Sequence, residues 1–390
     1  MKRILSIIIF LVCCVLFLNL GKNYIDDLEQ KAINDAINSD KYTVEEYANF
    51  QQELNNKTFY YYNHLSDEQK DDYITLYFAV LNFDKSCKVE VSEDELKTIL
   101  FAIIYDNSNI FWLSGDYTYY VHSEYIELVP EYSYTKEDAN TISVNLQNRI
   151  NKIISGIPAY SNDFEKELYL HDYICDNTVY DDSTYLNGGD TAHSSLLEGK
   201  SICEGYARAM QILLDAVGIE NYLVVGDGTS EGVTEPHMWN IVNIDGQNYH
   251  LDVTWNDSVT RNADGYFYFN VTDDYILRDH SNLAPQNNNC VYNFANYYVV
   301  NNTYVEMFTG FDSLVSPTAQ ALRNGELTVS FVFKNDSDFK RAIDMTNDNA
   351  TLFDYVHKSV EKSGRNLSVT NVAFSTIEDY NYLCIEFKKE

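Results

Sequence analysis

The sequence is poor in basic residues and, apart from the adjacent Cys13 and Cys14 near the N-terminus, has no closely spaced cysteine pairs. Only 27 Lys and Arg accompany 59 Asp and Glu, so the formal net charge is −32. A chain this acidic repels the phosphate backbone of nucleic acids and anionic lipid headgroups, which argues against nucleic acid as a partner. The chain also contains no internal repeat and no low-complexity linker.

The spacing of the cysteines excludes two common uses of this residue. Five of the seven lie beyond the first 20 residues, widely scattered, at Cys87, Cys175, Cys203, Cys290 and Cys384. No disulfide framework is visible, and no C-x-x-C or H-x-x-x-H pair suggests zinc. An exported chain with an odd number of thiols either pairs with another chain or keeps a reactive cysteine. We expect no required metal and no cofactor.

The N-terminus carries an export signal. Met1-Lys2-Arg3 precedes an apolar run from Ile4 to Leu20, the pattern of a positive n-region and an apolar h-region. No cleavage site of the A-x-A kind follows, so residues 1–22 are either a signal peptide or an uncleaved membrane anchor. A lipoprotein is disfavoured because Val12, and no small residue, precedes Cys13. The rest of the chain is expected outside the cell.

Hydrophobic residues make up 45% and aromatic residues 14%, so most of the chain should fold, and 390 residues suggest two or three domains. Residues 23–134 are expected to be a helical or mixed region that begins as a polar, stalk-like stretch. Capping boxes at Ser66 and Ser92 open predicted helices over 66–81 and 92–105, and alternating aromatic residues over 115–134 indicate strands.

Residues 135–282 form the predicted catalytic domain, which starts with helices over 136–154 and 162–177. Residues 283–390 are expected to be a small α+β domain that carries no chemical motif. Within it, strands are predicted over 327–334 and 383–388, and helices over 338–343 and 352–363.

A helix over about 202–217 is expected to present a cysteine. Its apolar positions recur at helical spacing from Tyr206 onward and stop before Gly218. Ser201 and Glu204 read as a capping box, which would make Ser201 the N-cap and place Cys203 in the first turn. The positive end of the helix dipole favours a thiolate there, and the backbone N–H could receive an oxyanion. The alternative is a buried, inert thiol.

Two alternating runs, 237–244 and 247–254, flank Asp245-Gly246 and predict a two-residue hairpin. In that register Trp239 faces Asp252, so His237 and Asp252 are diagonal neighbours about 7 Å apart on one face. A carboxylate can therefore hold the imidazole of His237.

Together these residues offer a nucleophile, a base and an orienting acid for acyl transfer: Cys203, His237 and Asp252. Sequence physics alone leaves open whether the helix docks beside the hairpin. Trp239 and Glu204 are candidate substrate-binding residues, although packing explains a tryptophan on a hairpin equally well. His250 could replace His237 as the base, but it lies farther from the strand end and is expected to be a supporting residue. His171 is expected to be a satisfied core or interface histidine and not a ligand.

The strings Leu196–Ala207, His237-Met238-Trp239-Asn240 and Tyr249–Asn256 resemble the bacterial transglutaminase-like superfamily. The resemblance covers about 140 residues and implies a papain-like α+β core in which Cys203 attacks an acyl group, His237 moves the proton and Asp252 orients the ring. Met238 stands where such sequences commonly have a small residue, and no oxyanion partner upstream of Cys203 can be assigned. Animal members of the superfamily use calcium, but no Asp-x-Asp-x-Asp-Gly loop occurs here.

The predicted function is that of an extracellular thiol enzyme, a cysteine acyltransferase or a cysteine peptidase or amidase, acting on peptide or protein amides. A cell-wall peptide or surface protein is the substrate that the expected location suggests. The competing hypothesis is a noncatalytic surface module that binds or scaffolds, motivated by terminal regions that carry no chemical motif.

Overall fold

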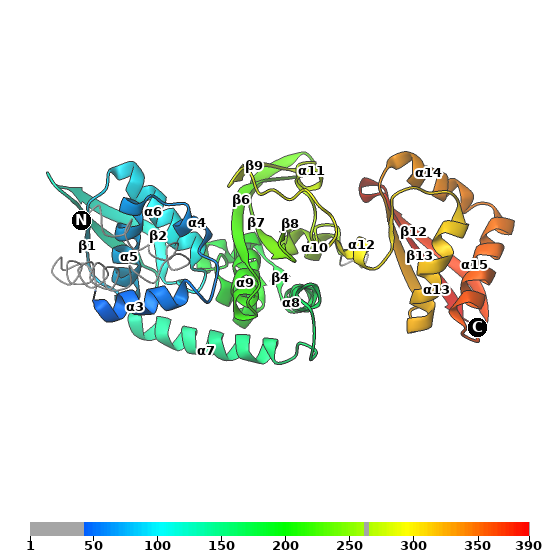
Figure 1. Cartoon of the computed structure of the whole chain (residues 1–390), viewed down its shortest axis with the longest axis horizontal. Helices are drawn as coiled ribbons and strands as arrows, with labels where there is room; N and C mark the ends of the chain where they lie inside the picture. The colour runs from blue at the N-terminus through cyan, green and yellow to red at the C-terminus, as the bar shows by residue number, and fades with distance from the viewer. Residues whose placement is uncertain (1–42, 261–264, 390) are drawn as a thin grey trace, which may run out of the picture. The chain divides into compact units, whose positions relative to one another are not determined.

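The computed structural model describes residues 43–260 and 265–389 (Figure 1). They form two compact units: the first contains described residues up to 260 together with Asp273–Val291, and the second contains 265–272 and the described residues from Tyr292 onward. The predicted leader, 1–22, lies outside the described residues. Within the ranges that are described, no helix combines the length and apolar character needed to cross a membrane.

The N-terminal part of the first unit is mixed, as its sequence predicts. Its strands form an antiparallel sheet of order β1-β3-β2, and its core is rich in aromatic rings. The elements are α3 (Val44–Glu53), α4 (Tyr60–Asn63), α5 (Asp67–Asn82), β1 (Cys87–Val89), α6 (Glu93–Asp106), β2 (Leu113–Val121) and β3 (Ile126–Tyr132).

Both predicted capping boxes in this part are confirmed. The side chains of Ser66 and Ser92 accept from the backbone N–H groups of Gln69 and Glu95, whose side chains return the bond. The expectation of a stalk is wrong for its described portion, because α3 packs into the core. Phe50 on α3 is fully buried and contacts several aromatic rings.

The central part of the first unit combines helices with an antiparallel four-stranded sheet of order β8-β7-β6-β9. Helix α9 packs on β6 and β7 of this sheet, beside which it is drawn in Figure 1. The elements are α7 (Lys136–Ile154), α8 (Asp163–Asn177), β4 (Val179–Tyr180), η1 (Asp182–Asn187), η2 (Ser194–Glu198), β5 (Lys200–Ser201), α9 (Cys203–Ala216), β6 (Asn221–Ser230), β7 (Val233–Ile244), β8 (Gln247–Leu251), α10 (Val253–Thr260), α11 (Asp273–Ile276) and β9 (His280–Ala284).

The predicted hairpin has the predicted register, with Ile244 opposite Gln247 and Asn240 opposite Leu251. Asp245 and Gly246 both have positive φ, 52° and 78°, as a type I′ turn requires. The expected extent of the second strand is wrong: β8 ends at Leu251 and α10 begins at Val253. Asp252 therefore occupies the junction between a strand and a helix and is not a strand residue.

The N-terminal part is hydrogen-bonded to side chains of α9. Arg208 Nη1 donates to the carbonyl of Ile104 at 2.9 Å, and Gln211 Nε2 donates to the carbonyl of Tyr105 at 3.0 Å. Ser108 donates its hydroxyl to the side-chain oxygen of the same Gln211, which is buried. Three polar contacts thus join the end of α6 and the segment after it to the helix that bears Cys203.

The second unit is a smaller mixed fold with its own core. Its sheet has the order β10-β11-β13-β12, and each predicted strand and helix of this region overlaps an observed one, whereas α13 and β12 were not predicted. The elements are α12 (Tyr297–Val300), β10 (Tyr304–Val305), η3 (Phe311–Leu314), α13 (Val315–Asn324), β11 (Thr328–Phe333), α14 (Asp336–Met345), α15 (Asn349–Ser363), β12 (Val369–Ile377), η4 (Glu378–Tyr380) and β13 (Tyr382–Lys389).

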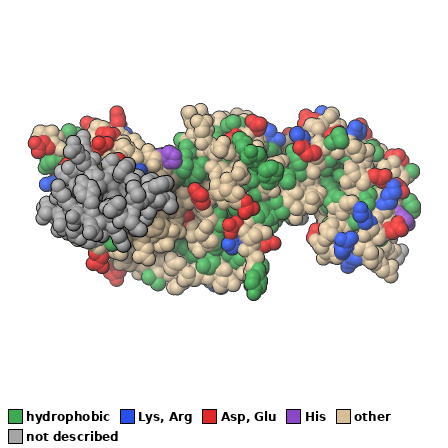
Figure 2. Space-filling view, in the orientation of Figure 1, with side chains coloured by type: hydrophobic (Ala, Val, Ile, Leu, Met, Phe, Trp, Pro, Cys, Tyr) green, Lys and Arg blue, Asp and Glu red, His purple; other side chains and the backbone are tan. Residues whose placement is uncertain are grey.

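The chain is therefore of mixed α+β class, as predicted, with a cysteine-bearing helix packed on an antiparallel sheet. Acidic side chains are dispersed over the face drawn in Figure 2, in keeping with the composition. The boundaries proposed at 134/135 and 282/283 stay predictions.

Candidate active site

Cys203 lies in the first turn of α9, as predicted, where it is the first helical residue, and it is buried. The predicted capping box is wrong, because the N-cap is Ile202 and makes no side-chain cap bond. Ser201 instead donates its hydroxyl to the carbonyl of Gly189 at 2.6 Å and lies 3.1 Å from the hydroxyl of Ser194. Ser201 thus holds the preceding loop in place by hydrogen bonds. Cys203 still lies in the first turn of the helix, as expected.

His237 and Asp252 come together as the hairpin register predicts. His237 Nε2 and Asp252 Oδ2 are 2.7 Å apart, and both residues are buried. Oδ1 of Asp252 accepts from the backbone N–H of Trp255 at 3.1 Å, and its carbonyl accepts from Asn256. Asp252 is thus the N-cap of α10, which fixes its carboxylate independently of the imidazole.

The third member lies near the same ring, because Cys203 is close enough to His237 to contribute to raising the pKa of the imidazole. Since Nε2 of His237 faces Asp252, Nδ1 is the nitrogen left for the sulfur. The structure therefore brings together the helix start and the hairpin, the step that the sequence left open. The catalytic roles of Cys203, His237 and Asp252 stay predictions.

The electrostatic surroundings favour the charged forms of both His237 and Asp252. Burial opposes a charge on His237, but the Asp252 carboxylate and the nearby Cys203 outweigh it and raise the pKa of His237 to about 10. For Asp252, burial also opposes ionisation, yet His237 and a second histidine, His280, hold the pKa of the carboxyl well below its usual range. At neutral pH the arrangement is an imidazolium held by a carboxylate.

Trp239 lies behind His237, with the two ring centroids 5.8 Å apart, and is only 1% exposed. Its Nε1–H donates to Nδ1 of His250 at 2.9 Å, and Nε2 of His250 lies 2.9 Å from Asp273. His250 therefore supports the tryptophan, as the sequence predicted for a supporting residue. A contact between Trp239 and substrate stays a prediction.

Two glycines on β6, Gly226 and Gly228, leave space for the side chains of Trp239 and Trp255. A Cβ at Gly228 would lie 2.8 Å from Trp255, and one at Gly226 would lie 2.9 Å from Trp239 and 2.7 Å from the carbonyl of Ser281. Any side chain at these positions would displace an indole next to His237.

Sequence reasoning missed His280, the first residue of β9. Its Nε2 lies 3.2 Å from the same Oδ2 of Asp252 that binds His237, and its Nδ1 lies 2.6 Å from Asp279. Its ring also packs against Trp255, with centroids 4.4 Å apart. No local sequence pattern predicts such a residue, because the contact joins β9 to the strand–helix junction at Asp252, 28 residues earlier in the chain.

His171, predicted to be a satisfied core histidine, is one. It is buried, with Nδ1 2.9 Å from Asp172 and Nε2 3.0 Å from the side-chain nitrogen of Asn256. Tyr180 is a further unpredicted neighbour of the site: burial, and then the proximity of Cys203, raise the pKa of its partly exposed hydroxyl.

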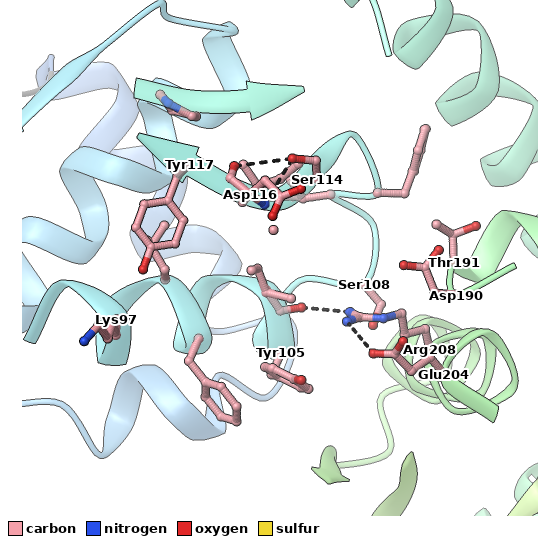
Figure 3. A pocket seen from close by; sticks show the side chains of 18 of the residues that line it. Lys97, Tyr105, Ser108, Ser114, Asp116, Tyr117, Asp190, Thr191, Glu204 and Arg208 are labelled. Atoms are coloured by element: carbon pink, nitrogen blue, oxygen red, sulfur yellow. Dashed lines mark hydrogen bonds and ion pairs between the residues drawn. The ribbon is translucent and has the colours of Figure 1, made fainter. Parts of the chain in front are cut away.

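Glu204 follows Cys203 and lines a cavity of about 370 Å³ between α9 and the N-terminal part (Figure 3). Figure 3 shows Glu204 beside Arg208, whose guanidinium is 3.8 Å from its carboxylate. Burial raises the pKa of Glu204, although Arg208 acts in the opposite direction. Asp190 and Tyr105 contribute to the same cavity. Binding of substrate by Glu204 stays a prediction.

Among the residues that the structure describes, two groups of side chains could bring metal-ligating atoms together: His237 with Asp252 and His280, and His250 with Asp273 and Cys290. In the second group, the indole N–H of Trp239 points at Nδ1 of His250, which must therefore accept. The ring proton then lies on Nε2 and is donated to Asp273. A metal at Nε2 would move that proton to Nδ1, opposite another donor, so this donor set does not suit a cation.

Comparison with known proteins gives one family match. Residues 152–253 match the model of the Transglutaminase-like superfamily, so this segment is a transglutaminase-like domain. The matched range contains Cys203, His237 and Asp252. No curated protein matches the chain.

Three solved structures are similar over part of the chain. One is a crystal structure of a TGase, with 16% identity and a TM-score of 0.26, covering 43% of this chain and 50% of the other. A candidate cysteine protease from Cytophaga hutchinsonii has 14% identity and a TM-score of 0.25, covering 36% and 61%. A candidate protease from Parabacteroides distasonis has 13% identity and a TM-score of 0.23, covering 35% of each chain. This chain thus spans less than two thirds of each of these proteins.

Proposed function

We propose that this protein is an exported thiol enzyme that hydrolyses peptide or protein amides or transfers their acyl group to an amine. The observation that carries the proposal is the sequence of contacts from the Cys203 side chain to His237 and from His237 to Asp252, which is 2.7 Å away. A nucleophile, a proton carrier and an orienting acid are the three parts that such chemistry needs.

In the first half of the reaction the thiolate of Cys203 attacks the carbonyl carbon of the amide. The negative charge moves to the carbonyl oxygen, where the backbone N–H of Cys203 can donate to it, because the first N–H of a helix has no acceptor within the helix. His237 then gives its proton to the nitrogen of the leaving amine, the C–N bond breaks, and a thioester remains on Cys203.

In the second half an acceptor attacks the thioester, and His237, now neutral, takes a proton from it. The C–S bond breaks and the thiolate is restored. Water as the acceptor gives an acid and defines a hydrolase, whereas a primary amine gives a new amide and defines a transferase. Access of water to the site decides between the two.

The location and the substrate belong to the same proposal. The leader at residues 1–22 supports export, either released or anchored, and an extracellular site suggests cell-wall peptide or a surface protein as the substrate. Fractionation of cells, with protease treatment of intact cells, tests it. A chain that stays with the cytosolic fraction and is protected from protease would overturn the export part.

The enzymatic part is tested with a dansyl-amine and a glutamine-bearing peptide, following amine incorporation, ammonia and peptide release together. Cys203→Ala should abolish all three signals. Cys175→Ala, a change at another cysteine of the same unit, should retain them. Equal signals from both variants and the unaltered chain would remove Cys203 as the nucleophile. If no thioester can be trapped on any cysteine and no peptide gives a signal, the noncatalytic surface module would be favoured.

A further inference from the structure

The carboxylate of Asp252 is shared by two imidazoles. His237 lies 2.7 Å and His280 lies 3.2 Å from its Oδ2, each through Nε2, and all three residues are buried. The ring centroids of the two histidines are 5.3 Å apart. His280 therefore touches the group that orients His237, but from β9, a strand that the proposed reaction does not otherwise use.

Both nitrogens of His280 face carboxylates. Nδ1 is 2.6 Å from Oδ1 of Asp279, and Nε2 faces Asp252. An ionised carboxylate can only accept hydrogen bonds, and a neutral imidazole has a single N–H. Two ionised carboxylates at these distances can both be satisfied only when the ring carries two protons, that is, when His280 is an imidazolium.

We propose that His280 is a positioning residue of this site, an imidazolium that anchors the Asp252 carboxylate between Asp279 and His237 and offsets part of its charge. The inference rests on the proposed function of Cys203, His237 and Asp252. It assigns His280 two separable effects: its N–H donation fixes the direction of the carboxylate, and its charge sets how firmly His237 retains its proton.

The charged surroundings of His280 agree with this assignment. Burial disfavours the charged ring, but the bonds to Asp252 and Asp279 outweigh it and raise the pKa of His280, while His237 acts against it. His250 feels the same charge, which contributes to lowering the pKa of that buried ring. On the neighbouring strand β6, the carboxylate of Asp227 is bonded to Asn282. The ionisable groups around His280 are thus Asp252, Asp279, His237, His250 and Asp227.

Two substitutions separate the two effects. His280→Gln keeps an N–H donor for Asp252 but removes the charge, and His280→Phe keeps a ring between the tryptophans but removes both. His193→Gln is the control: it changes another buried histidine of the same unit, one that contacts Tyr134 and not Asp252. Thermal unfolding of all three variants shows whether each remains folded.

The readout needs no substrate, so it is independent of whether the amide assay succeeds. Carboxamidomethylation of Cys203 by iodoacetamide is followed against pH by mass spectrometry of its peptide. Loss of a unit charge 5.3 Å from His237 should move the alkaline limb, where His237 loses its proton, up by about one to two pH units in both variants. At pH 7, His280→Phe should also react about tenfold more slowly, whereas His280→Gln should stay near the unaltered rate.

If the alkaline limb of the pH profile of Cys203 alkylation does not move in either variant, the positive charge assigned to His280 is refuted. If the alkylation rate at pH 7 is unchanged in His280→Phe, the positioning role is refuted. Nitrogen-15 spectra of histidine-labelled protein give a direct check, with two protonated ring nitrogens expected for His280 from pH 6 to 8. A ring nitrogen of His280 without a proton between pH 6 and 8 would contradict the proposal. Loss of the Nε2 proton signals of His237 and His280 when zinc is added would also contradict it.

Discussion

Replacing Asp252 by Asn should change the protonation of His237 while leaving the fold nearly intact. The amide keeps an oxygen for the N-cap bond to Trp255, so α10 retains its start. The substitution removes the carboxylate that raises the pKa of His237 to about 10. Burial of the imidazole, which lowers its pKa, remains. The pKa of His237 should therefore fall to 6.5 or below.

The size of the effect follows from these values. At pH 8 the imidazolium fraction of His237 is about 99% with the carboxylate present and about 3% at a pKa of 6.5. The alkylation of Cys203 at pH 8 should therefore slow by up to about fourfold, because a thiol with the ordinary pKa of about 8.5 and no imidazolium partner is still about 24% thiolate at that pH. Amide turnover should fall by at least as much, since the proton donor is lost as well.

The same substitution has a signature in stability. A pKa raised from 6.5 to about 10 stabilises the folded chain fully below pH 6.5, and this contribution is lost as the pH rises through 10. The free energy of unfolding of the unaltered chain should exceed that of Asp252→Asn by at most about 5 kcal/mol near pH 6, and the difference should shrink toward pH 10. Urea titrations at several pH values measure it. Superimposable alkylation profiles of the two proteins, with a stability difference independent of pH, would refute the ion pair.

Three further outcomes are expected. Cys203→Ala should abolish turnover with a midpoint of thermal unfolding within about 2 °C of Cys175→Ala, and residual turnover in a purified sample would point to another nucleophile. Gly228→Ala should cost about 1–3 kcal/mol in urea unfolding and lower activity, because the new Cβ would meet Trp255 at 2.8 Å; an unchanged midpoint would contradict that packing. Burial raises the pKa of Asp215 to about 7, so stability should rise as the pH falls from 7 toward 4, and Asp215→Asn should flatten this rise; parallel pH curves would contradict it.

Sequence patterns predicted the parts of the site that depend on local geometry. The Asp245-Gly246 turn fixes a two-residue loop, so the alternation of the flanking runs determines which residues face each other, and His237 meets Asp252 as a result. Helical spacing that stops before Gly218 predicted the helix that begins at Cys203, although the capping box used to place its start was wrong. Both are short-range consequences of backbone periodicity.

The predictions that failed concern hydrogen-bond partners that a local sequence pattern does not reveal. Ser201 has the sequence of a cap, but its hydroxyl is taken by the carbonyl of Gly189, contributed by an upstream loop. Asp252 continues an alternating run, yet it caps a helix, because a carboxylate that accepts from Trp255 N–H ends the strand there. His280 was missed for the same reason, since only the pairing of β9 with β6 brings it to Asp252.

The contacts of Arg208 and Gln211 with the carbonyl groups at the end of α6 have a practical meaning for anyone who wants a minimal active fragment. A chain shortened to begin at residue 135 would leave these side chains without their acceptors on the helix that positions Cys203, and would uncover the apolar residues around them. The segment that precedes the transglutaminase-like domain should therefore be retained in any such truncation, as a structural brace for the nucleophile.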